Sequence, residues 1–224
     1  MSVLAYVVEE KNAPISAAVI WLHGLGADGS DFLPVVEELS FPKTLGIRFV
    51  FPHAPLRPVT INAGRMMRAW YDLYALSGPT PENETQLRAV SEQVHMLIES
   101  QEAQGIPTHR IILAGFSQGG ATALFAGLRY PKPLGGIMAL SGYLPLSQKT
   151  EAEKNVVNQK TPIFIAHGDR DTILPCTAGE QSAEFLKAQG YSVSWHRYSM
   201  AHEVCRSEIS DIAGSGWIGF VCDG

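Results

Sequence analysis

The sequence predicts a single α/β domain in which helices cover both faces of a mostly parallel central sheet. Apolar segments of strand length alternate along the chain with segments whose apolar residues recur at helical spacing. The strand segments are apolar almost throughout, which is typical of parallel strands buried on both faces. With 224 residues, the chain can form one substantial core but is short for two domains.

The elements follow one another in a regular order. The predicted strands are residues 3–8, 17–22, 47–51, 110–114, 136–142, 162–168 and 192–198. The predicted helices are residues 30–39, 83–103, 121–130 and 178–189, with a closing helix that begins near Glu203. Residues 147–160 form a polar connection. We find no internal repeat, low-complexity tract or linker, so the predicted domain comprises residues 1–224.

Residues 53–82 interrupt this order. The segment is rich in proline and has no clear period, which predicts a long ordered loop. Loops of such length in a compact domain are usually functional or disordered. The pair Trp70-Tyr71 favours a functional loop, because aromatic side chains need a surface on which to pack. We therefore expect this loop on the substrate side of the domain.

Charge and composition exclude several classes of protein. The net charge is −5, from 17 basic and 22 acidic residues with no basic run, so nucleic acid is not an expected partner. The amino terminus lacks a basic signal-peptide region, and no apolar run approaches the ~20 residues of a membrane span, so stable membrane insertion is not expected. Three scattered cysteines, Cys176, Cys205 and Cys222, indicate free thiols and a cytoplasmic protein. The seven histidines show no metal-ligand spacing, and we expect no metal site.

The segment from Gly115 to Gly120 carries the strongest chemical signal. It reads Gly115-Phe116-Ser117-Gln118-Gly119-Gly120 and joins a predicted strand to a predicted helix. A serine between two glycines at such a turn is the nucleophile-elbow pattern. The glycines permit a turn too crowded for a Cβ, and the helix directs N–H groups toward a developing oxyanion. Because this short pattern also occurs by chance in glycine-rich loops, the assignment needs an acid and a histidine later in the chain.

Suitable partners follow two later strands. Ligand sites of parallel sheets lie beyond the carboxyl ends of the strands. Asp169 and Asp171 come directly after strand 162–168, and His202 follows strand 192–198. With Ser117 they give the order Ser, Asp, His of the α/β-hydrolase fold. The serine would be the nucleophile, the histidine its general base, and a carboxylate would hold the imidazole tautomer. Spacing does not decide between the aspartates; Asp171 is favoured because Asp169 is better placed to cap the turn.

The segment from Gly24 to Gly29 matches two different patterns. Gly24-Leu25-Gly26-Ala27-Asp28-Gly29 fits the dinucleotide fingerprint, which requires an acid at the end of the next strand. That strand ends Phe51-Pro52-His53, without an acid, so nucleotide binding is rejected. In a hydrolase the loop after this strand donates an N–H to the oxyanion. We expect the N–H groups of Leu25 and Gln118 to form the oxyanion hole.

Over nearly its whole length, the chain resembles the bacterial carboxylesterases of the acyl-protein thioesterase/lysophospholipase family. The matching segments are Trp21-Leu22-His23-Gly24-Leu25-Gly26, Met67-Arg68-Ala69-Trp70-Tyr71-Asp72, Leu113-Ala114-Gly115-Phe116-Ser117-Gln118-Gly119-Gly120, His167-Gly168-Asp169-Arg170-Asp171 and Met200-Ala201-His202-Glu203-Val204. The resemblance implies a triad of Ser117, Asp171 and His202. It also implies oxyanion donors at Leu25 and Gln118 and no cofactor.

The resemblance further implies a place for the substrate. Trp70 and Tyr71 would form an acyl-binding wall, with Ile173 beside the catalytic acid, although the two aromatics could instead be ordinary core residues. The tail differs from similar family members, which end in a helix of apolar and basic residues. Three glycines lie in residues 214–219, and each costs ~1 kcal/mol in a helix relative to alanine. We therefore expect residues 214–224 to be irregular.

We expect a serine carboxylesterase that hydrolyses short-to-medium acyl esters through an acyl-enzyme. The apolar loop offers a groove for a small-molecule acyl ester and no clamp for a charged group. One alternative is an acyl-protein thioesterase or lysophospholipase that acts on long acyl chains. Another, from a different class, is a catalytically silent binding module with the hydrolase fold. Exposed aromatics of the long loop could also form a homodimer contact.

Overall fold

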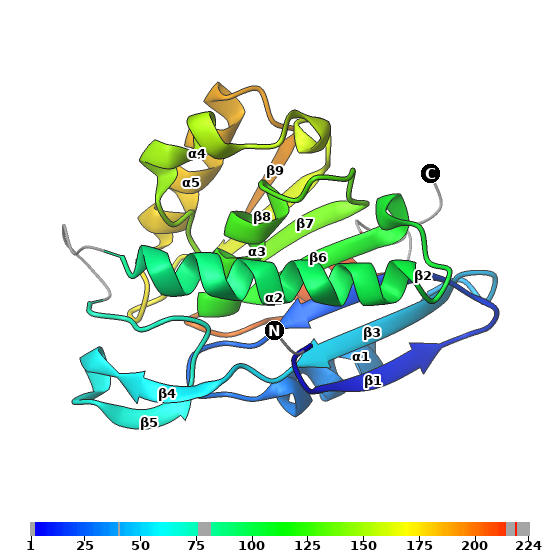
Figure 1. Cartoon of the computed structure of the whole chain (residues 1–224), viewed down its shortest axis with the longest axis horizontal. Coiled ribbons are helices and arrows are strands. Elements are labelled where there is room, and N and C mark those ends of the chain that lie inside the picture. Colours follow the sequence, from blue (N-terminus) through cyan, green and yellow to red (C-terminus); the bar gives the residue numbers. More distant parts are fainter. Residues whose placement is uncertain (1–2, 40, 76–81, 214–217, 219–224) are drawn as a thin grey trace.

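Seven strands form one sheet in the order β1-β3-β2-β6-β7-β8-β9 (Figure 1). They are β1 (Tyr6–Lys11), β2 (Ile15–Leu22), β3 (Gly46–Pro52), β6 (Ile111–Phe116), β7 (Gly136–Leu140), β8 (Ile163–Gly168) and β9 (Val193–Tyr198). The edge strand β1 is antiparallel to β3, and all other pairs are parallel. This computed structural model describes residues 3–39, 41–75, 82–213 and 218. The predicted, mostly parallel sheet of a single α/β domain is confirmed.

Apolar side chains fill the space on both faces of the sheet. Along β6, Ile111 and Leu113 belong to one core cluster, whereas Ile112 and Ala114 belong to the other. Successive strand residues point to opposite faces, so a strand covered on both faces must be apolar throughout. This explains why the strand segments of the sequence are unbroken apolar runs.

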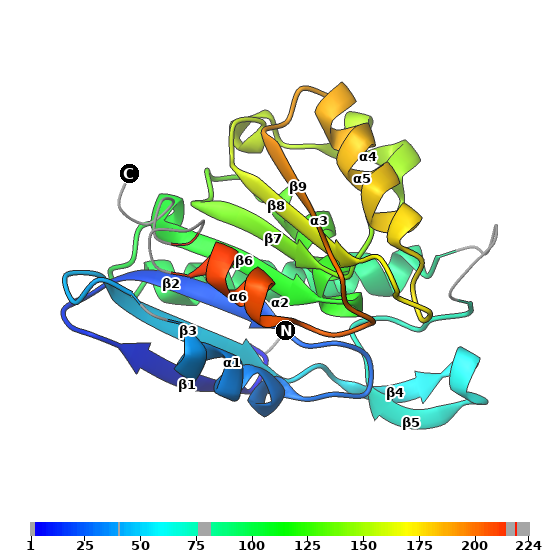
Figure 2. The ribbon, with the colours of Figure 1, turned by 180° about the vertical axis from the view of Figure 1, so that it is seen from behind.

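Helices cover each face. The first cluster includes residues of α2 (Glu84–Glu102), α3 (Gln118–Gly127) and α5 (Cys176–Ala188), and the second includes residues of α1 (Leu33–Glu38) and α6 (Arg206–Ile212). Figures 1 and 2 show these two sets on opposite sides of the sheet. The α2 helix begins where the Asn83 side chain accepts a hydrogen bond from the Gln86 N–H, at 3.1 Å. No described helix has the length and apolarity needed to cross a bilayer.

The structure differs from the prediction for residues 53–82. Their described part contains a small antiparallel hairpin of β4 (Leu56–Val59) and β5 (Arg65–Arg68), joined by a 3₁₀ turn, and not a loop throughout. The hairpin extends beyond the main sheet (Figure 1). Pro58 lies in β4, and proline is confined to edge strands because it donates no hydrogen bond. In the sequence this proline favours a loop, which is why the hairpin was not predicted.

Two further segments depart from the prediction. The polar connection at residues 147–160 contains the short helix α4 (Ser147–Glu153), and the closing helix begins at Arg206 and not near Glu203. Only Thr150 of α4 is buried, so the helix has no apolar stripe for a sequence pattern to detect. The predicted irregular tail, residues 214–224, lies outside the described residues except for Ile218, which is buried in the second core cluster.

Candidate active site

Ser117 lies at the sharp turn between β6 and α3. Its backbone angles are φ 55° and ψ −119°, a conformation that costs a non-glycine residue on the order of 1–3 kcal/mol. The turn is crowded on both sides: a Cβ on Gly115 would lie 2.2 Å from the Gly119 carbonyl, and one on Gly119 would lie 2.1 Å from the Leu22 carbonyl oxygen. Only glycine fits at these two positions. The surrounding backbone thus holds the serine in its strained conformation.

His202 bridges Ser117 and Asp171. Its Nε2 lies 2.9 Å from the Ser117 Oγ, and its Nδ1 lies 2.6 Å from the Asp171 Oδ2. The three residues follow β6, β8 and β9, whose carboxyl ends lie along one edge of the sheet. The structure therefore brings together the three side chains that the sequence selects. In this arrangement the imidazole can accept the serine proton while its other nitrogen donates to the carboxylate.

The Asp171 carboxylate is buried but well supplied with hydrogen-bond donors. Its Oδ1 accepts from the backbone N–H groups of Ile173 and Leu174, at 2.8 and 2.9 Å. Burial opposes its ionisation, but the bonds from His202 and from these two N–H groups outweigh that effect and lower the pKa of Asp171. Asp169, the other aspartate of this loop, has an exposed side chain beside Arg170. Of the two aspartates, the structure places Asp171 against the histidine.

Two hydrogen bonds tie the loop that carries Leu25 to neighbouring segments, and a third lies within the loop. His23 is buried, and its Nε2 accepts from the Ala54 N–H at 3.0 Å while its Nδ1 lies 2.7 Å from the Gly24 carbonyl. Burial lowers the pKa of His23, so its imidazole is neutral with the proton on Nδ1. Gly26, at φ 79°, donates its N–H to the Arg68 carbonyl at 2.9 Å. The loop is therefore fixed beside Ser117 before any substrate binds.

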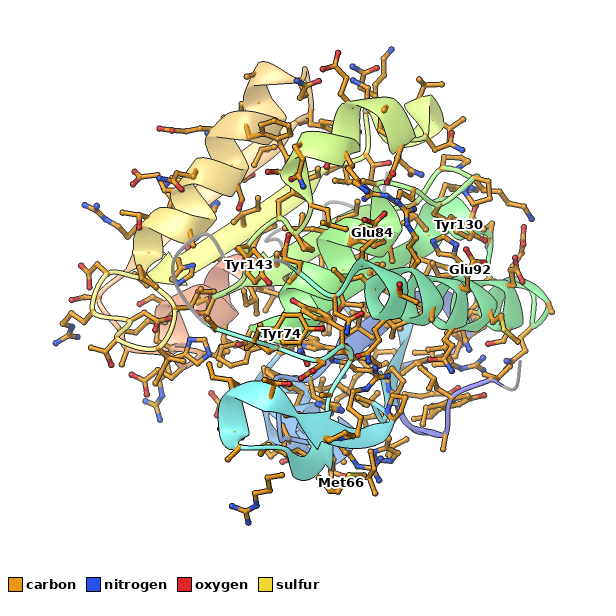
Figure 3. All side chains as sticks on the ribbon, turned by 60° about the vertical axis from the view of Figure 1, so that its left-hand side comes forward. Met66, Tyr74, Glu84, Glu92, Tyr130 and Tyr143 are labelled. Atoms are coloured by element: carbon orange, nitrogen blue, oxygen red, sulfur yellow. The ribbon has the colours of Figure 1, made fainter. Side chains whose placement is uncertain are left out.

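A cavity of about 1020 Å³ opens over these residues. Ser117, His202, Leu25 and Gln118 all line it. Most of its remaining walls are apolar or aromatic. These lining residues include Phe32, Val35, Ile61, Tyr71, Leu73, Tyr74, Phe116, Tyr143, Leu144, Ile173, Leu174 and Pro175. Figure 3 shows Tyr74 and Tyr143 between α5 and the β4–β5 hairpin. The cavity is at the upper end of the usual size range for small-molecule sites.

Comparison with known proteins shows the family to which the chain belongs. The family model described as Phospholipase/Carboxylesterase matches residues 4–215. The chain belongs to this family. Acyl-protein thioesterase 1 of Neurospora crassa is 40% identical over 206 residues, which cover 88% of this chain and 84% of that protein. Acyl-protein thioesterase 1 of Schizosaccharomyces pombe is 41% identical over 171 residues, which cover 76% and 75%.

Solved structures give the same relationship. Arabidopsis thaliana SOBER1 superimposes with a TM-score of 0.83 at 32% identity, covering 88% of this chain and 95% of that one. Acyl-protein thioesterase 2 of Zea mays superimposes with a TM-score of 0.80 at 26% identity, covering 93% and 95%. As a member of the phospholipase/carboxylesterase family, this chain is an α/β hydrolase that acts on esters.

The predicted substrate-side residues divide into two groups. Tyr71 and Ile173 line the cavity, and Ile173 is half exposed. Trp70 is fully buried and is absent from the described cavity lining, so the prediction that it forms part of an acyl-binding wall is wrong. Its Nε1–H donates to the His23 carbonyl at 2.7 Å, and its ring packs on the His23 imidazole. Trp70 therefore supports the loop that carries Leu25 from behind.

Two side chains near the serine were missed by sequence reasoning. The Gln118 side chain accepts from the Trp70 N–H at 2.9 Å and donates to the Tyr71 carbonyl at 2.7 Å, which joins α3 to the long loop. Tyr143 follows β7, and its hydroxyl lies 3.0 Å from that of Tyr71. Burial raises the pKa of Tyr71 well above its ordinary value, so its hydroxyl stays protonated beside that of Tyr143. No spacing pattern marks Tyr143, because it meets Tyr71 only through the tertiary fold.

No group of three or more His, Cys, Asp or Glu side chains that could hold a metal ion occurs among the described residues.

Proposed function

We propose that this hydrolase is an acyl-protein thioesterase that also cleaves oxygen esters, and that Ser117, His202 and Asp171 are its catalytic triad. The observation that carries the proposal is the position of the His202 imidazole, within 2.9 Å of the Ser117 Oγ and 2.6 Å of the Asp171 Oδ2. Relatives named acyl-protein thioesterase support the thioester, long-chain alternative better than the short-chain esterase that the sequence alone favours.

The proposed reaction has two halves. The Ser117 Oγ attacks the acyl carbon while His202 Nε2 takes its proton; the carbon–sulfur or carbon–oxygen bond then breaks, and the imidazolium protonates the leaving group. A water then attacks the acyl-enzyme, with His202 again as the base, and releases the carboxylic acid. The N–H groups of Leu25 and Gln118 are the proposed donors to the oxyanion in both halves. Gln118 is the first residue of α3, so its N–H has no carbonyl partner within the helix.

The charges around the cavity favour one kind of leaving group. The lining includes the acidic residues Asp31, Asp72, Glu82 and Glu203 and, among the described residues, no lysine or arginine. A leaving group that carries phosphates would approach this rim against a negative field. We therefore propose an S-acylated cysteine of a neutral or basic protein segment as substrate, in preference to a coenzyme A thioester. The size of the cavity and its apolar walls are compatible with a long acyl chain.

A panel of substrates tests this proposal. Peptides with an S-octanoyl or S-hexadecanoyl cysteine are compared with the oxygen esters and coenzyme A thioesters of the same chains. We expect kcat/KM for the S-acyl peptides to exceed that for the coenzyme A thioesters by at least ~10-fold, and this preference to shrink as salt screens the acidic rim. Equal values for both leaving groups at all salt concentrations would contradict the proposed substrate class.

The nucleophile is tested with the same panel. Ser117→Ala is expected to lower kcat by more than ~10³-fold, since the residual rate would come only from binding and the oxyanion hole. Ser100→Ala is the matched control, because Ser100 lies on α2 and its hydroxyl bonds to Leu97 and Gln101 of the same helix. Activity that survives in Ser117→Ala at the level of the control would remove the triad from the proposal.

A further inference from the structure

His167 is a second imidazole that contacts the Asp171 carboxylate, besides His202. It lies near the end of β8 and is fully buried. Its Nε2 lies 2.9 Å from the Leu174 carbonyl oxygen and 3.2 Å from the Asp171 Oδ2. The same Oδ2 is the atom that meets His202 Nδ1 at 2.6 Å. Two imidazoles therefore approach one carboxylate oxygen.

The partners of His167 fix its tautomer. A carbonyl oxygen only accepts, so the Nε2 that faces Leu174 must carry the proton. The other ring nitrogen, Nδ1, is buried and has no hydrogen-bond partner among the described residues; it faces α5, where a Cβ on Gly179 would lie 2.6 Å from it. Burial lowers the pKa of His167, which is consistent with a neutral ring. The Nε2–H therefore bonds to the Leu174 carbonyl, and the Asp171 Oδ2 lies 3.2 Å from the same nitrogen.

These bonds close a ring around the loop that carries Asp171. The Leu174 N–H donates to Asp171 Oδ1, and the Leu174 carbonyl accepts from His167. His167 thus contacts both ends of this turn, and its Nε2 lies 3.2 Å from the Oδ2 that meets His202. A buried nitrogen left without a partner at Nδ1 costs stability, which an apolar side chain at this position would avoid. The presence of histidine in spite of this cost suggests that its Nε2–H is needed to hold the turn.

We propose that His167 is a positioning residue for catalysis: its Nε2–H holds the Asp171 carboxylate in the orientation in which Oδ2 meets His202. This inference rests on the proposed triad. His167 does not line the cavity in the described structure, so it reaches the site through its contacts with the Asp171–Leu174 turn. A base that is held less firmly reaches its productive geometry less often, which lowers kcat more than it raises KM.

The test compares His167→Gln with His167→Leu. The glutamine Nε2 is as many bonds from the backbone as the histidine Nε2, so glutamine can keep the donor, whereas leucine removes it. We expect His167→Leu to lower kcat by about 10-fold or more with KM changed by less than about 2-fold, by analogy with lost second partners of metal ligands. His167→Gln is expected to retain kcat within about 3-fold. Rates are normalised to the sites that react with a fluorophosphonate, so a fraction of unfolded protein does not count as lost kcat.

A double-mutant cycle with Asp171→Asn separates positioning from a merely structural role. If His167 acts through Asp171, His167→Leu should lower kcat no further in the Asp171→Asn background. Equal losses in the leucine and glutamine variants, a wild-type kcat in His167→Leu, or additive losses in the cycle would each overturn the inference. If the leucine variant does not fold, His167→Met takes its place. Should Asp171→Asn alone leave kcat unchanged, the proposed triad fails, and not only the role of His167.

Discussion

Asp171 is the residue at which charge, burial and geometry combine most closely. Its side chain is fully buried, yet the donors around it keep its pKa below the ordinary value. A buried carboxylate in this state can hold a neutral histidine in one tautomer and stabilise the imidazolium that forms during the reaction. The local environment therefore distinguishes the two aspartates. Asp171 is buried among hydrogen-bond donors, whereas Asp169, only two positions away, is exposed.

Asp171→Asn tests this residue directly. The amide would present an N–H or an uncharged oxygen to His202 Nδ1, which favours the wrong tautomer and removes the charge that stabilises the imidazolium. We expect kcat to fall by roughly 10⁴-fold, with folding retained because the side chain keeps its shape. Asp169→Asn is the control, since that side chain is exposed beside Arg170, and its kcat should stay within about 2-fold of wild type. A greater loss of kcat in Asp169→Asn than in Asp171→Asn would make Asp169, and not Asp171, the acid of the triad.

At the level of elements, the turn from β6 to α3 depends on glycines that nothing else can replace. In Gly119→Ala, the new Cβ would lie 2.1 Å from the Leu22 carbonyl oxygen, which is backbone and cannot turn aside. We expect this variant to lose about 3 kcal/mol or more of its free energy of unfolding, or to fail to fold. Urea denaturation followed by circular dichroism measures the loss.

Gly105→Ala provides the matched comparison. A Cβ there would meet nothing within 4 Å, but the backbone lies at φ 92°, which strains any side chain. The expected cost is about 1 kcal/mol from backbone strain alone. If both variants were equally stable, crowding would not be the reason for glycine at the turn.

The elements that could be predicted from the sequence are those in which one local pattern decides the structure. The strands of the main sheet are buried on both faces, so their apolar runs are visible without the fold. The β4–β5 hairpin and α4 have no such pattern, because Pro58 interrupts one and α4 buries only Thr150. The sequence could select Trp70 as important but could not tell which side of the cavity wall it occupies.

The same limit applies to the candidate site. Ser117, Asp171 and His202 follow strand ends, so topology alone brings them to one edge of the sheet. Tyr143 and His167 contribute through contacts across the fold, and the contact of His167 depends on how the next loop returns to its strand. A histidine at the end of a strand is usually a packing residue whose hydrogen bonds are satisfied. Only the distances to its partners distinguish that role from the positioning of a catalytic side chain.

For the molecule as a whole, one buried acid makes stability depend on pH. Glu208 on α6 is fully buried, and burial raises its pKa from 4.5 to about 8, with the nearby Asp211 acting in the same direction. The folded protein therefore keeps a proton on Glu208 between pH 4.5 and about 8 that the unfolded chain has released. In this window the unfolded state binds fewer protons, so stability falls as pH rises, and the loss is complete above about pH 8.

Glu208→Gln is expected to remove this dependence. The variant should match wild type near pH 4.5 and exceed its free energy of unfolding above pH 8, by up to a few kcal/mol. Urea denaturation at several pH values measures the difference, with the exposed Glu184→Gln as the control. Parallel curves for wild type and Glu208→Gln across the whole range would show that Glu208 does not titrate in this window.

The measurement that tests the central proposal most directly is the identification of the acyl-enzyme. Wild-type protein and Ser117→Ala are mixed with an activated acyl ester, quenched in acid within the first turnover, digested and examined by mass spectrometry. We predict one acyl group on the wild-type peptide that contains Ser117 and none on the variant. An acyl group on another residue, or turnover in wild type without acylation of Ser117, would contradict the proposed mechanism.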